Sequence, residues 1–259
     1  MRALGVPGRK RGGARAACVL VSGGLDSAVL LRDALRAYER VQPLYVRAGL
    51  RWEPAEILWL RRFLRALTSP RLRPLAVIDV PMADLYGTHW STGGRRTPGF
   101  HEGDGSVYLP GRNITLFSKA ATFCALRGFP VLLSGILDAN PFPDSTPIFL
   151  RGMERALSAG LGRTIRIRTP YRRLTKDKVI RRGRDLPLAL TFSCVNPRPG
   201  GGHCGDCCKC AERIFAFRRA GIPDPTAYAG GPGVFGTPSS RRSRRVSGSK
   251  RASTTRLAP

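Results

Sequence analysis

The residues best suited to chemistry near the start of the chain form one segment, Val21-Ser22-Gly23-Gly24-Leu25-Asp26-Ser27. An apolar stretch precedes it and an amphipathic stretch follows it, so the sequence predicts a strand, a tight turn and a helix in that order. Such a turn directs backbone N–H groups and the positive end of a helix dipole at one point, which suits a phosphate group. Glycine leaves room for the anion and tolerates a positive φ. The Gly-Lys-[Ser/Thr] ending of a Walker A loop is missing, so this is another kind of phosphate-binding turn.

Four cysteines toward the other end of the chain have the spacing of a metal site. Cys194 lies ten residues before Cys204, and Cys207 and Cys210 follow at gaps of two residues. Such gaps let successive turns of the backbone present several thiolates to one ion, and Cys194 completes a tetrahedral set of four. We therefore expect a structural zinc site, because four thiolates leave no position open for water. An iron–sulfur cluster is the alternative, since three cysteines at these gaps also suit one.

The other cysteines and a nearby histidine have different expected roles. Cys208 falls inside the last gap and is predicted to point away from the metal, while Cys18 and Cys124 lie in apolar stretches and are predicted to be buried. His203 is an alternative ligand to Cys194, or else a supporting or solvent-facing residue. Clustered cysteines indicate metal binding in a reducing compartment rather than a disulfide framework, so we expect a cytoplasmic protein.

Strands and helices alternate along the chain and must position these residues. The predicted strands cover residues 17–21, 41–46, 75–80, 131–135 and 165–169. The predicted helices cover residues 26–38, 53–67, 113–127, 145–158 and 175–182, with Asn113 expected to cap the third. Residues 81–110 lack periodicity and are expected to form a long loop or lid. This alternation predicts an α/β fold with a doubly wound, mostly parallel, Rossmann-like sheet, which binds ligands beyond the carboxyl ends of its strands.

Charge and composition divide the chain further. The formal net charge is +27, and residues 1–16 and 237–259 together hold twelve Lys or Arg residues and no acid. We expect a basic disordered tail over 1–16, a nucleotide-binding domain over 17–190, a zinc-binding region over 191–220, and a Gly/Pro-rich and then basic tail over 221–259. Nucleic acid could bind the tails, but no basic motif interleaved with aromatic residues requires it. No apolar run approaches the ~20 residues of a membrane span, so neither a membrane helix nor a signal peptide is expected.

Several motifs together resemble one family of enzymes. Ser22-Gly23-Gly24-Leu25-Asp26-Ser27 is similar to the pyrophosphate loop of the ATP pyrophosphatases. The later motifs, in order, are Leu109-Pro110-Gly111-Arg112-Asn113, Asn140-Pro141-Phe142-Pro143-Asp144, Thr169-Pro170 with Lys176, and the four cysteines. This arrangement resembles the 7-cyano-7-deazaguanine synthase family over about residues 17–220. The resemblance implies an adenine-nucleotide alpha-hydrolase-like fold with a zinc-binding knuckle after it.

The resemblance also implies a reaction. ATP with Mg²⁺ would adenylate the carboxylate of 7-carboxy-7-deazaguanine, ammonia would displace AMP to give an amide, and a second adenylation would convert the amide to a nitrile. The implied residues are Asp26 as a partner of magnesium or of a phosphate-bound water, Arg112 and Lys176 as counter-charges for phosphate, and Asn113, Asn140 and Asp144 as contacts of the purine-like ring. The resemblance leaves a homodimer open.

One segment departs from the family pattern. The family has an Asp-Tyr-Gly-Gln-Arg-His-like stretch after the second strand, whereas this chain has Arg47-Ala48-Gly49-Leu50-Arg51-Trp52. An acid has become Arg47, and two polar ring-contacting positions have become Leu50 and Trp52. The alternatives are therefore a related enzyme that activates another carboxylate or modifies tRNA as a thiolase does, and a non-catalytic zinc-knuckle protein that binds RNA.

Overall fold

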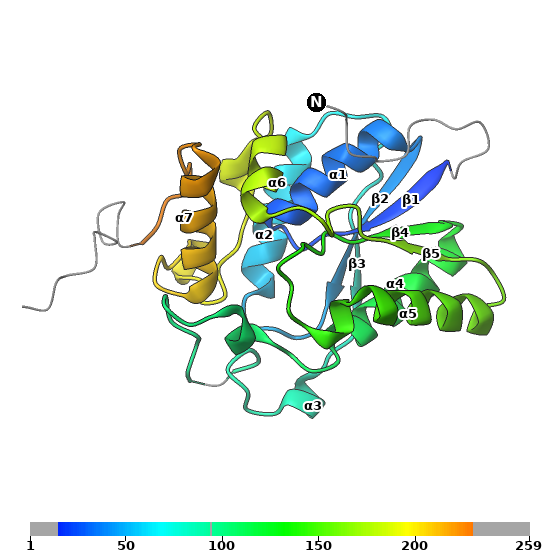
Figure 1. Cartoon of the computed structure of the whole chain (residues 1–259), viewed down its shortest axis with the longest axis horizontal. Coiled ribbons are helices and arrows are strands. Elements are labelled where there is room, and N and C mark those ends of the chain that lie inside the picture. The colour runs from blue at the N-terminus through cyan, green and yellow to red at the C-terminus, as the bar shows by residue number, and fades with distance from the viewer. Residues whose placement is uncertain (1–14, 94, 230–259) are drawn as a thin grey trace, which may run out of the picture.

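The computed structural model describes residues 15–93 and 95–229, and within them five parallel strands form one sheet (Figure 1). The strands are β1 (Ala16–Leu20), β2 (Arg40–Arg47), β3 (Ala76–Asp79), β4 (Val131–Leu133) and β5 (Arg166–Arg168). Their order is β3-β2-β1-β4-β5, so the chain first winds outward from β1 on one side and then returns to build the other side. The order reverses between β1 and β4, and ligands bind in such sheets at this switch point.

Helices cover both faces of the sheet. They are α1 (Leu25–Ala37), α2 (Glu53–Ala66), α3 (Ala83–Tyr86), α4 (Arg112–Arg127), α5 (Pro147–Gly160), α6 (Lys176–Arg182) and α7 (Cys208–Ala220). Short 3₁₀ helices cover Asp104–Val107, Pro143–Ser145, Leu188–Leu190 and Pro199–Gly201. Apolar residues of α1, α2, α6 and α7 share one core, and those of α4 and α5 share another across the sheet. The predicted doubly wound α/β fold is thus confirmed.

Alternating residues of β1 explain why both faces are covered. Ala17 and Val19 point into the core on the α1 side, while Ala16 and Cys18 point into the core on the α4 side. A central parallel strand that is apolar on both faces must be buried on both faces. Cys18 and Cys124 are fully buried in the second core, as predicted.

A buried network fixes α6 against α1. The Asp33 carboxylate on α1 accepts hydrogen bonds from Arg32 (3.0 Å), from the hydroxyl of Tyr171 (2.5 Å) and from Arg182 on α6 (2.5 Å). Arg32 also donates to Asp185 at 2.6 Å. Satisfied buried charges of this kind favour one arrangement of the elements that carry them. The network therefore joins the middle of α1 to the end of α6.

Some local predictions were wrong. The cap of α4 is Gly111, with φ 74°, and the helix begins at Arg112, so Asn113 lies inside its first turn instead of capping it. The reason is that Asp144, which is distant in sequence, accepts the Asn113 backbone N–H at 2.9 Å. This hydrogen bond satisfies a free N–H group at the helix start, as an N-cap side chain would. A short helix, α3, interrupts the predicted loop over 81–110.

The predicted tail boundaries also differ from the structure. Ala16 belongs to β1, whereas the sequence predicts a tail that ends at residue 16. Residues 221–229, assigned to the second tail, pack on the fold: Ile222 lies against the core, and the Tyr228 ring lies 5.8 Å from that of His203. The remaining tail residues, 1–14 and 230–259, lie outside the described residues.

Candidate nucleotide and metal sites

Two serine hydroxyls hold the glycine turn after β1 together by hydrogen bonds to its backbone. The Ser22 hydroxyl accepts the Gly24 backbone N–H at 3.3 Å, and the Ser27 hydroxyl accepts the Ser22 N–H at 3.2 Å and donates to the Gly24 carbonyl at 3.1 Å. Gly23 has φ +78°, and a Cβ there would lie 3.0 Å from the Glu56 carbonyl oxygen of α2. Only glycine fits this position, because both the backbone conformation and the contact with α2 exclude a side chain.

The chain segment that leads to Cys194 holds the other side of this turn. The Phe192 backbone N–H donates to the Gly23 carbonyl at 2.7 Å. A Cβ on Gly24 would lie 3.5 Å from the Phe192 carbonyl oxygen. The turn is therefore clamped between α2 and residue 192, and it opens onto the amino end of α1, where the first helical N–H groups have no intrahelical acceptor. This is the geometry of an anion site.

Two predicted site residues meet at this point. The Lys176 ammonium, on the first residue of α6, lies 3.3 Å from Asp26 Oδ2 in the first turn of α1. Gly135, after β4, packs against the same place, since a Cβ there would lie 3.3 Å from the Asp26 backbone carbon. The structure thus brings Asp26 and Lys176 together at the β1–β4 switch point.

Two residues that the sequence analysis missed complete this charge cluster. Glu212 Oε1, on α7, lies 2.5 Å from the Lys176 Nζ, and Glu212 Oε2 lies 2.9 Å from the Lys209 Nζ. Burial would raise the pKa of Glu212, but the two lysines outweigh it and lower that pKa to about 2. Burial lowers the pKa of Lys176, but the carboxylates of Asp26 and Glu212 raise it by a larger amount. The net shift is upward, so this side chain stays charged.

Asp26 has the properties of a cation ligand. Burial raises its pKa, and Lys176 opposes that shift. Its Oδ1 atom is buried and has no hydrogen-bond partner among the residues the structure describes. A buried carboxylate oxygen without a donor is costly unless a ligand or ion completes it. The Asp26 carboxylate therefore fits a Mg²⁺ ion, which prefers carboxylate oxygens and phosphates.

Arg112 lies in a different cluster from Lys176. Its charge acts on two carboxylates of α2, since it lowers the pKa of Glu53 and of Glu56, in both of which burial has the larger and opposite effect. The net result raises the pKa of Glu56 to about 7, and the Tyr45 hydroxyl donates to this carboxylate at 2.6 Å. The Arg112 Nε is buried without a hydrogen-bond partner in the described part of the chain, which leaves a donor for a ligand.

The three predicted ring contacts are only partly brought together. Asp144 accepts both the backbone N–H and the side-chain amide of Asn113, at 2.9 and 3.2 Å. Asn140 uses its side-chain carbonyl to accept the Phe142 N–H at 3.1 Å, which stabilises its own turn. Asn113 and Asp144 therefore form one polar pair beside Arg112, while Asn140 lies in the adjoining turn.

The altered segment lines a cavity of about 650 Å³ at the carboxyl end of β2. Arg47 and Leu50 contribute to its wall, and Arg47 pairs with Asp79 at the end of β3 at 2.5 Å. Trp52 is buried and stacks on Trp90, with ring centroids 5.4 Å apart. Two arginines, Glu53 and several apolar residues therefore line this cavity, and none of the predicted site residues does.

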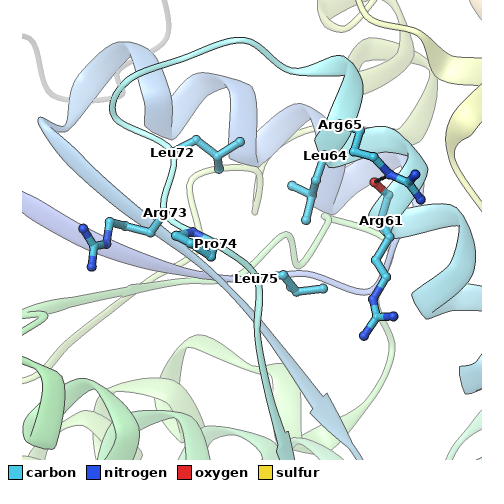
Figure 2. A pocket seen from close by; sticks show the side chains of 7 residues that line it. All are labelled: Arg61, Leu64, Arg65, Leu72, Arg73, Pro74 and Leu75. Atoms are coloured by element: carbon cyan, nitrogen blue, oxygen red, sulfur yellow. Dashed lines mark hydrogen bonds between the residues drawn. The ribbon is translucent and has the colours of Figure 1, made fainter.

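A second cavity, of about 510 Å³, lies away from the glycine turn (Figure 2). It is formed by the last turns of α2 and by the chain that enters β3, which places it at the amino end of that strand. Its lining combines apolar residues with three arginines, as Figure 2 shows: Arg61, Leu64, Arg65, Leu72, Arg73, Pro74 and Leu75. None of the predicted site residues lines it.

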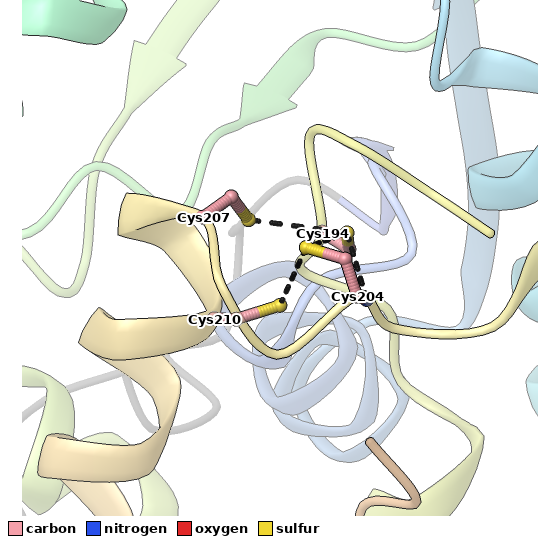
Figure 3. Close-up of side chains that lie close together, drawn as sticks. All are labelled: Cys194, Cys204, Cys207 and Cys210. Atoms are coloured by element: carbon pink, nitrogen blue, oxygen red, sulfur yellow. Dashed lines mark hydrogen bonds between the residues drawn. The ribbon is translucent and has the colours of Figure 1, made fainter. Parts of the chain in front are cut away.

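The four predicted metal ligands converge (Figure 3). The sulfurs of Cys194, Cys204, Cys207 and Cys210 all lie within 4.8 Å of one another, and Cys194 and Cys204 are 3.3 Å apart. Zn–S bonds of about 2.3 Å place the four sulfurs of a tetrahedral site about 3.8 Å apart. The Cys194 sulfur also accepts the backbone N–H groups of Asn196 and Cys204, at 3.3 and 3.4 Å. This arrangement fits a single ion held by four thiolates.

The two neighbouring residues lie outside this group. Cys208 is not among the four, as predicted, and burial raises the pKa of its thiol to about 11. His203 does not join the group either: its Nε2 accepts the Ser193 N–H at 3.2 Å, and burial lowers its pKa to about 3. His203 therefore supports the segment that leads to Cys194 as a neutral side chain.

A parallel sheet with a Ser-Gly-Gly-x-Asp-Ser turn at its switch point, and a lysine facing the aspartate, is typical of the ATP pyrophosphatase class of nucleotide-binding proteins. A family model described as Queuosine biosynthesis protein QueC matches residues 16–221. The chain therefore belongs to this family.

Individual relatives agree with that assignment. A 7-cyano-7-deazaguanine synthase of Anaeromyxobacter sp. is 35% identical over 227 residues, which cover 82% of this chain and 95% of the relative. One of Syntrophobacter fumaroxidans is 33% identical over 234 residues, or 83% and 96% of the two chains. A solved structure titled as a predicted subunit of a tRNA methyltransferase from Methanocaldococcus jannaschii gives a TM-score of 0.40 at 14% identity, covering 63% of this chain and 73% of that one. That likeness is too weak to carry an argument.

In the described parts of the chain, no helix combines the length and the apolar character needed to cross a membrane.

Proposed function

We propose that this chain is an ATP-dependent carbon–nitrogen ligase that converts 7-carboxy-7-deazaguanine and ammonia to 7-cyano-7-deazaguanine. The observation that carries the proposal is the pairing of Asp26 with Lys176 at the mouth of the glycine turn, in a chain of this family. Mg²⁺ and ATP are the implied cofactors. Members of the family named above are called synthases of this product, and the site of this chain suits the activation that such a synthesis needs.

The reaction balances in two rounds. In the first, a carboxylate oxygen attacks the α-phosphorus of ATP, pyrophosphate leaves, and ammonia then displaces AMP to form the amide. In the second, the amide oxygen is adenylated, pyrophosphate leaves again, and loss of AMP and protons gives the nitrile. Activation is needed because a carboxylate oxygen is a poor leaving group until it is adenylated.

The chain's own groups supply charge and position for these steps. The glycine turn and the amino end of α1 would cradle the phosphates, and Lys176 would offset the charge of the departing pyrophosphate. Asp26 would hold Mg²⁺, which supplies Lewis-acid stabilisation of the phosphoryl oxygens when bound. Arg112, whose Nε has no acceptor among the described residues, would donate to a second anionic group. Asn113 and Asp144 would recognise the polar edge of the ring through the pair they already form.

The four-cysteine centre has a structural role in this proposal, with zinc as its ion. Four thiolates fill a tetrahedral site, so no coordination position is left for substrate or water. The centre instead fixes Phe192, whose backbone N–H donates a hydrogen bond to the Gly23 carbonyl. It also fixes the start of α7, the helix that carries Glu212. A cytoplasmic location belongs to the proposal because a reducing compartment keeps these thiols available. A homodimer stays a prediction.

A second candidate function is the activation of a different carboxylate. The observation in its favour is the cavity wall at Arg47 and Leu50, where the family pattern has polar residues. A pocket that is built to bind a polar ring edge rejects ligands that leave its buried groups unpaired, at a cost of about 1–3 kcal/mol each. The change at this wall would therefore alter the choice of acceptor without affecting the use of ATP.

The deciding experiment measures pyrophosphate release with and without 7-carboxy-7-deazaguanine and ammonium, and identifies the product by mass spectrometry. Release that depends on the acceptor, together with a product of nitrile mass, supports the proposal. Release with neither amide nor nitrile would favour another carboxylate. Release that requires tRNA would favour a thiolase-like enzyme, and no release under any condition would favour an RNA-binding protein that has lost catalysis.

A further inference from the structure

Glu212 has no part in the reaction described above, yet it lies at the centre of the charge cluster. A carboxylate beside a site for polyphosphate is unfavourable in itself, because both groups are negative. Two lysines, Lys176 and Lys209, compensate this charge at 2.5 and 2.9 Å. The side chain is largely buried, with 26% of it exposed, so its position is fixed by packing as well as by charge. A largely buried carboxylate that is paired with two lysines at this position indicates a function in the site.

The distances indicate that role. The Lys176 ammonium lies closer to Glu212, at 2.5 Å, than to Asp26, at 3.3 Å. Asp26 keeps one oxygen without any hydrogen-bond donor from the described residues. If the charge of Glu212 were absent, Asp26 would be the remaining carboxylate in contact with this ammonium. A cation for the nucleotide would then have to compete with Lys176 for the same carboxylate.

We propose that Glu212 is a positioning residue that holds Lys176 away from Asp26 and thereby keeps the Asp26 carboxylate available for the divalent cation of the nucleotide. This inference rests on the proposed function, because it takes the ligand of Asp26 to be the cation of a bound ATP. Lys176 is then held over the phosphate site by two acids in the free protein and is released toward the phosphates when they arrive.

The position of Glu212 depends on the four-cysteine centre. Cys207 is the N-cap of α7, Cys210 lies in its first turn, and Glu212 follows two residues later. The sulfurs of Cys207 and Cys210 belong to the cluster in Figure 3, so an ion bound there fixes the turn from which Glu212 projects. The four-cysteine centre is thus connected to the proposed nucleotide site in two ways, through Phe192 and through Glu212.

The test compares full-length, zinc-loaded wild type with Glu212→Gln. Binding of Mn²⁺ is measured by electron paramagnetic resonance in the presence of α,β-methylene-ATP, an analogue that cannot release pyrophosphate. We expect the dissociation constant of Mn²⁺ to rise at least about threefold in the variant. The Mg²⁺ concentration for half-maximal pyrophosphate release should rise by a similar factor, while the rate at saturating Mg²⁺ recovers most of the wild-type value.

Two further variants make the outcome specific. Asp206→Asn removes an exposed carboxylate near the same cysteines that pairs with Arg198 instead of Lys176, and it should leave Mn²⁺ binding unchanged. In a Lys176→Met background, Glu212→Gln should weaken Mn²⁺ binding much less than in wild type, because the ammonium through which Glu212 acts is gone.

Three results would count against this inference or its premise. Unchanged Mn²⁺ affinity in Glu212→Gln with zinc retained would overturn it, and so would an equal loss in the Lys176→Met background, since Glu212 would then attract the cation directly. Failure of the wild type to bind Mn²⁺ with the nucleotide analogue would instead refute the proposed function. Zinc content and melting temperature, measured on each variant, separate these results from misfolding.

Discussion

Asp26 combines three properties that rarely meet in one carboxylate. It lies in the first turn of a helix, it contacts a buried lysine, and one of its oxygens is buried without a donor among the described residues. The Asp33 network holds the middle of α1 against the end of α6, and Gly135 packs closely against Asp26 itself. The carboxylate is therefore held in place before any ligand binds, which lowers the cost of ordering the site when one does.

Asp26→Ala should abolish catalysis without unfolding the protein. We expect pyrophosphate release to fall at least about 100-fold, because the variant loses its cation ligand and the charge balance of Lys176. The free energy of unfolding should change by less than about 1 kcal/mol, since the substitution deletes no core group and relieves a buried oxygen that lacks a donor. Asp84→Ala, at an exposed position of α3, is the matched control and should keep its turnover. Near-normal turnover in Asp26→Ala would refute the phosphate-site assignment.

Glu56 should make stability depend on pH near neutrality. Its pKa is raised from 4.5 to about 7 in the folded protein, mainly by burial. The folded state therefore holds this proton more tightly than the unfolded state does, so the contribution is favourable at low pH and is lost as the pH rises from about 4.5 to about 7. Glu56→Gln keeps a hydrogen-bond partner for the Tyr45 hydroxyl and removes the titration.

The measurement compares urea unfolding of wild type and Glu56→Gln at several pH values. Relative to the variant, wild type should lose about 1–3 kcal/mol across this window. Taking the difference between the two proteins cancels the titration of the other carboxyl groups and the effect of acid on the cysteine centre. A constant difference across the window would show that the Glu56 pKa is close to its ordinary value.

At the scale of elements, the chain joins the metal centre to the glycine turn through residues 191–194 and through α7. Arg213 on α7 is 1% exposed and donates to the Thr191 hydroxyl at 2.9 Å and to the Leu188 carbonyl at 3.0 Å. These bonds tie the helix that starts at the cysteines to the segment that contacts Gly23. A continuous path of packed groups therefore connects the four-cysteine centre to the glycine turn.

Serine substitutions should distinguish the four cysteines that bind the metal from Cys208, which does not. Each of Cys194→Ser, Cys204→Ser, Cys207→Ser and Cys210→Ser should lower zinc content and cost several kcal/mol of stability, because the free energy of metal binding contributes to folding in such sites. Cys208→Ser should retain one zinc per chain. Elemental analysis and thermal unfolding provide both readouts. Iron in protein purified without oxygen, or equal damage from Cys208→Ser, would contradict the assignment.

Local patterns account for the parts of the site that could be predicted. The glycine turn and the gaps between Cys204, Cys207 and Cys210 are read from neighbouring residues, and the structure confirms both as compact units. Glu212 could not be found in this way, because its contact with Lys176 depends on how α7 packs against α6. The only signal in the sequence was an acid two residues after the last predicted metal ligand, Cys210. The cap of α4 was missed for the same reason, since Asp144 reaches it across 31 residues.

At the scale of the whole molecule, the fold was predictable because alternation of apolar strands and amphipathic helices is a property of the entire chain. The strand order β3-β2-β1-β4-β5 places the turn after β1 at the switch point. What the pattern does not contain is the packing of the long segment between β3 and α4. There, Gly99 pairs with Cys207, and the Phe100 ring lies 5.6 Å from that of Phe215, so this segment rests on the cysteine region.

The basic ends of the chain should be dispensable for the chemistry. Deletion of residues 1–12 and 237–259 removes most of the tail charge and very little apolar sequence, so pyrophosphate release with a small acceptor should stay within about twofold of the full chain. The comparison is a steady-state assay of both proteins at equal zinc content. A large loss with the small acceptor would show that a tail contributes to the site, whereas a loss confined to assays with tRNA would favour the RNA-modifying alternative.

The hydrogen bond from Phe192 to the Gly23 carbonyl, at 2.7 Å, has a thermodynamic consequence. Coupling between two binding sites is reciprocal, so if an ordered cysteine centre tightens the turn for nucleotide, bound nucleotide must tighten the centre for its metal by the same factor. A saturating nucleotide analogue should then lower the fraction of zinc that a coloured chelator removes at equilibrium, and an unchanged zinc affinity would show that the two sites act independently. Under metal shortage, enzyme molecules occupied by ATP would be the last to surrender their zinc.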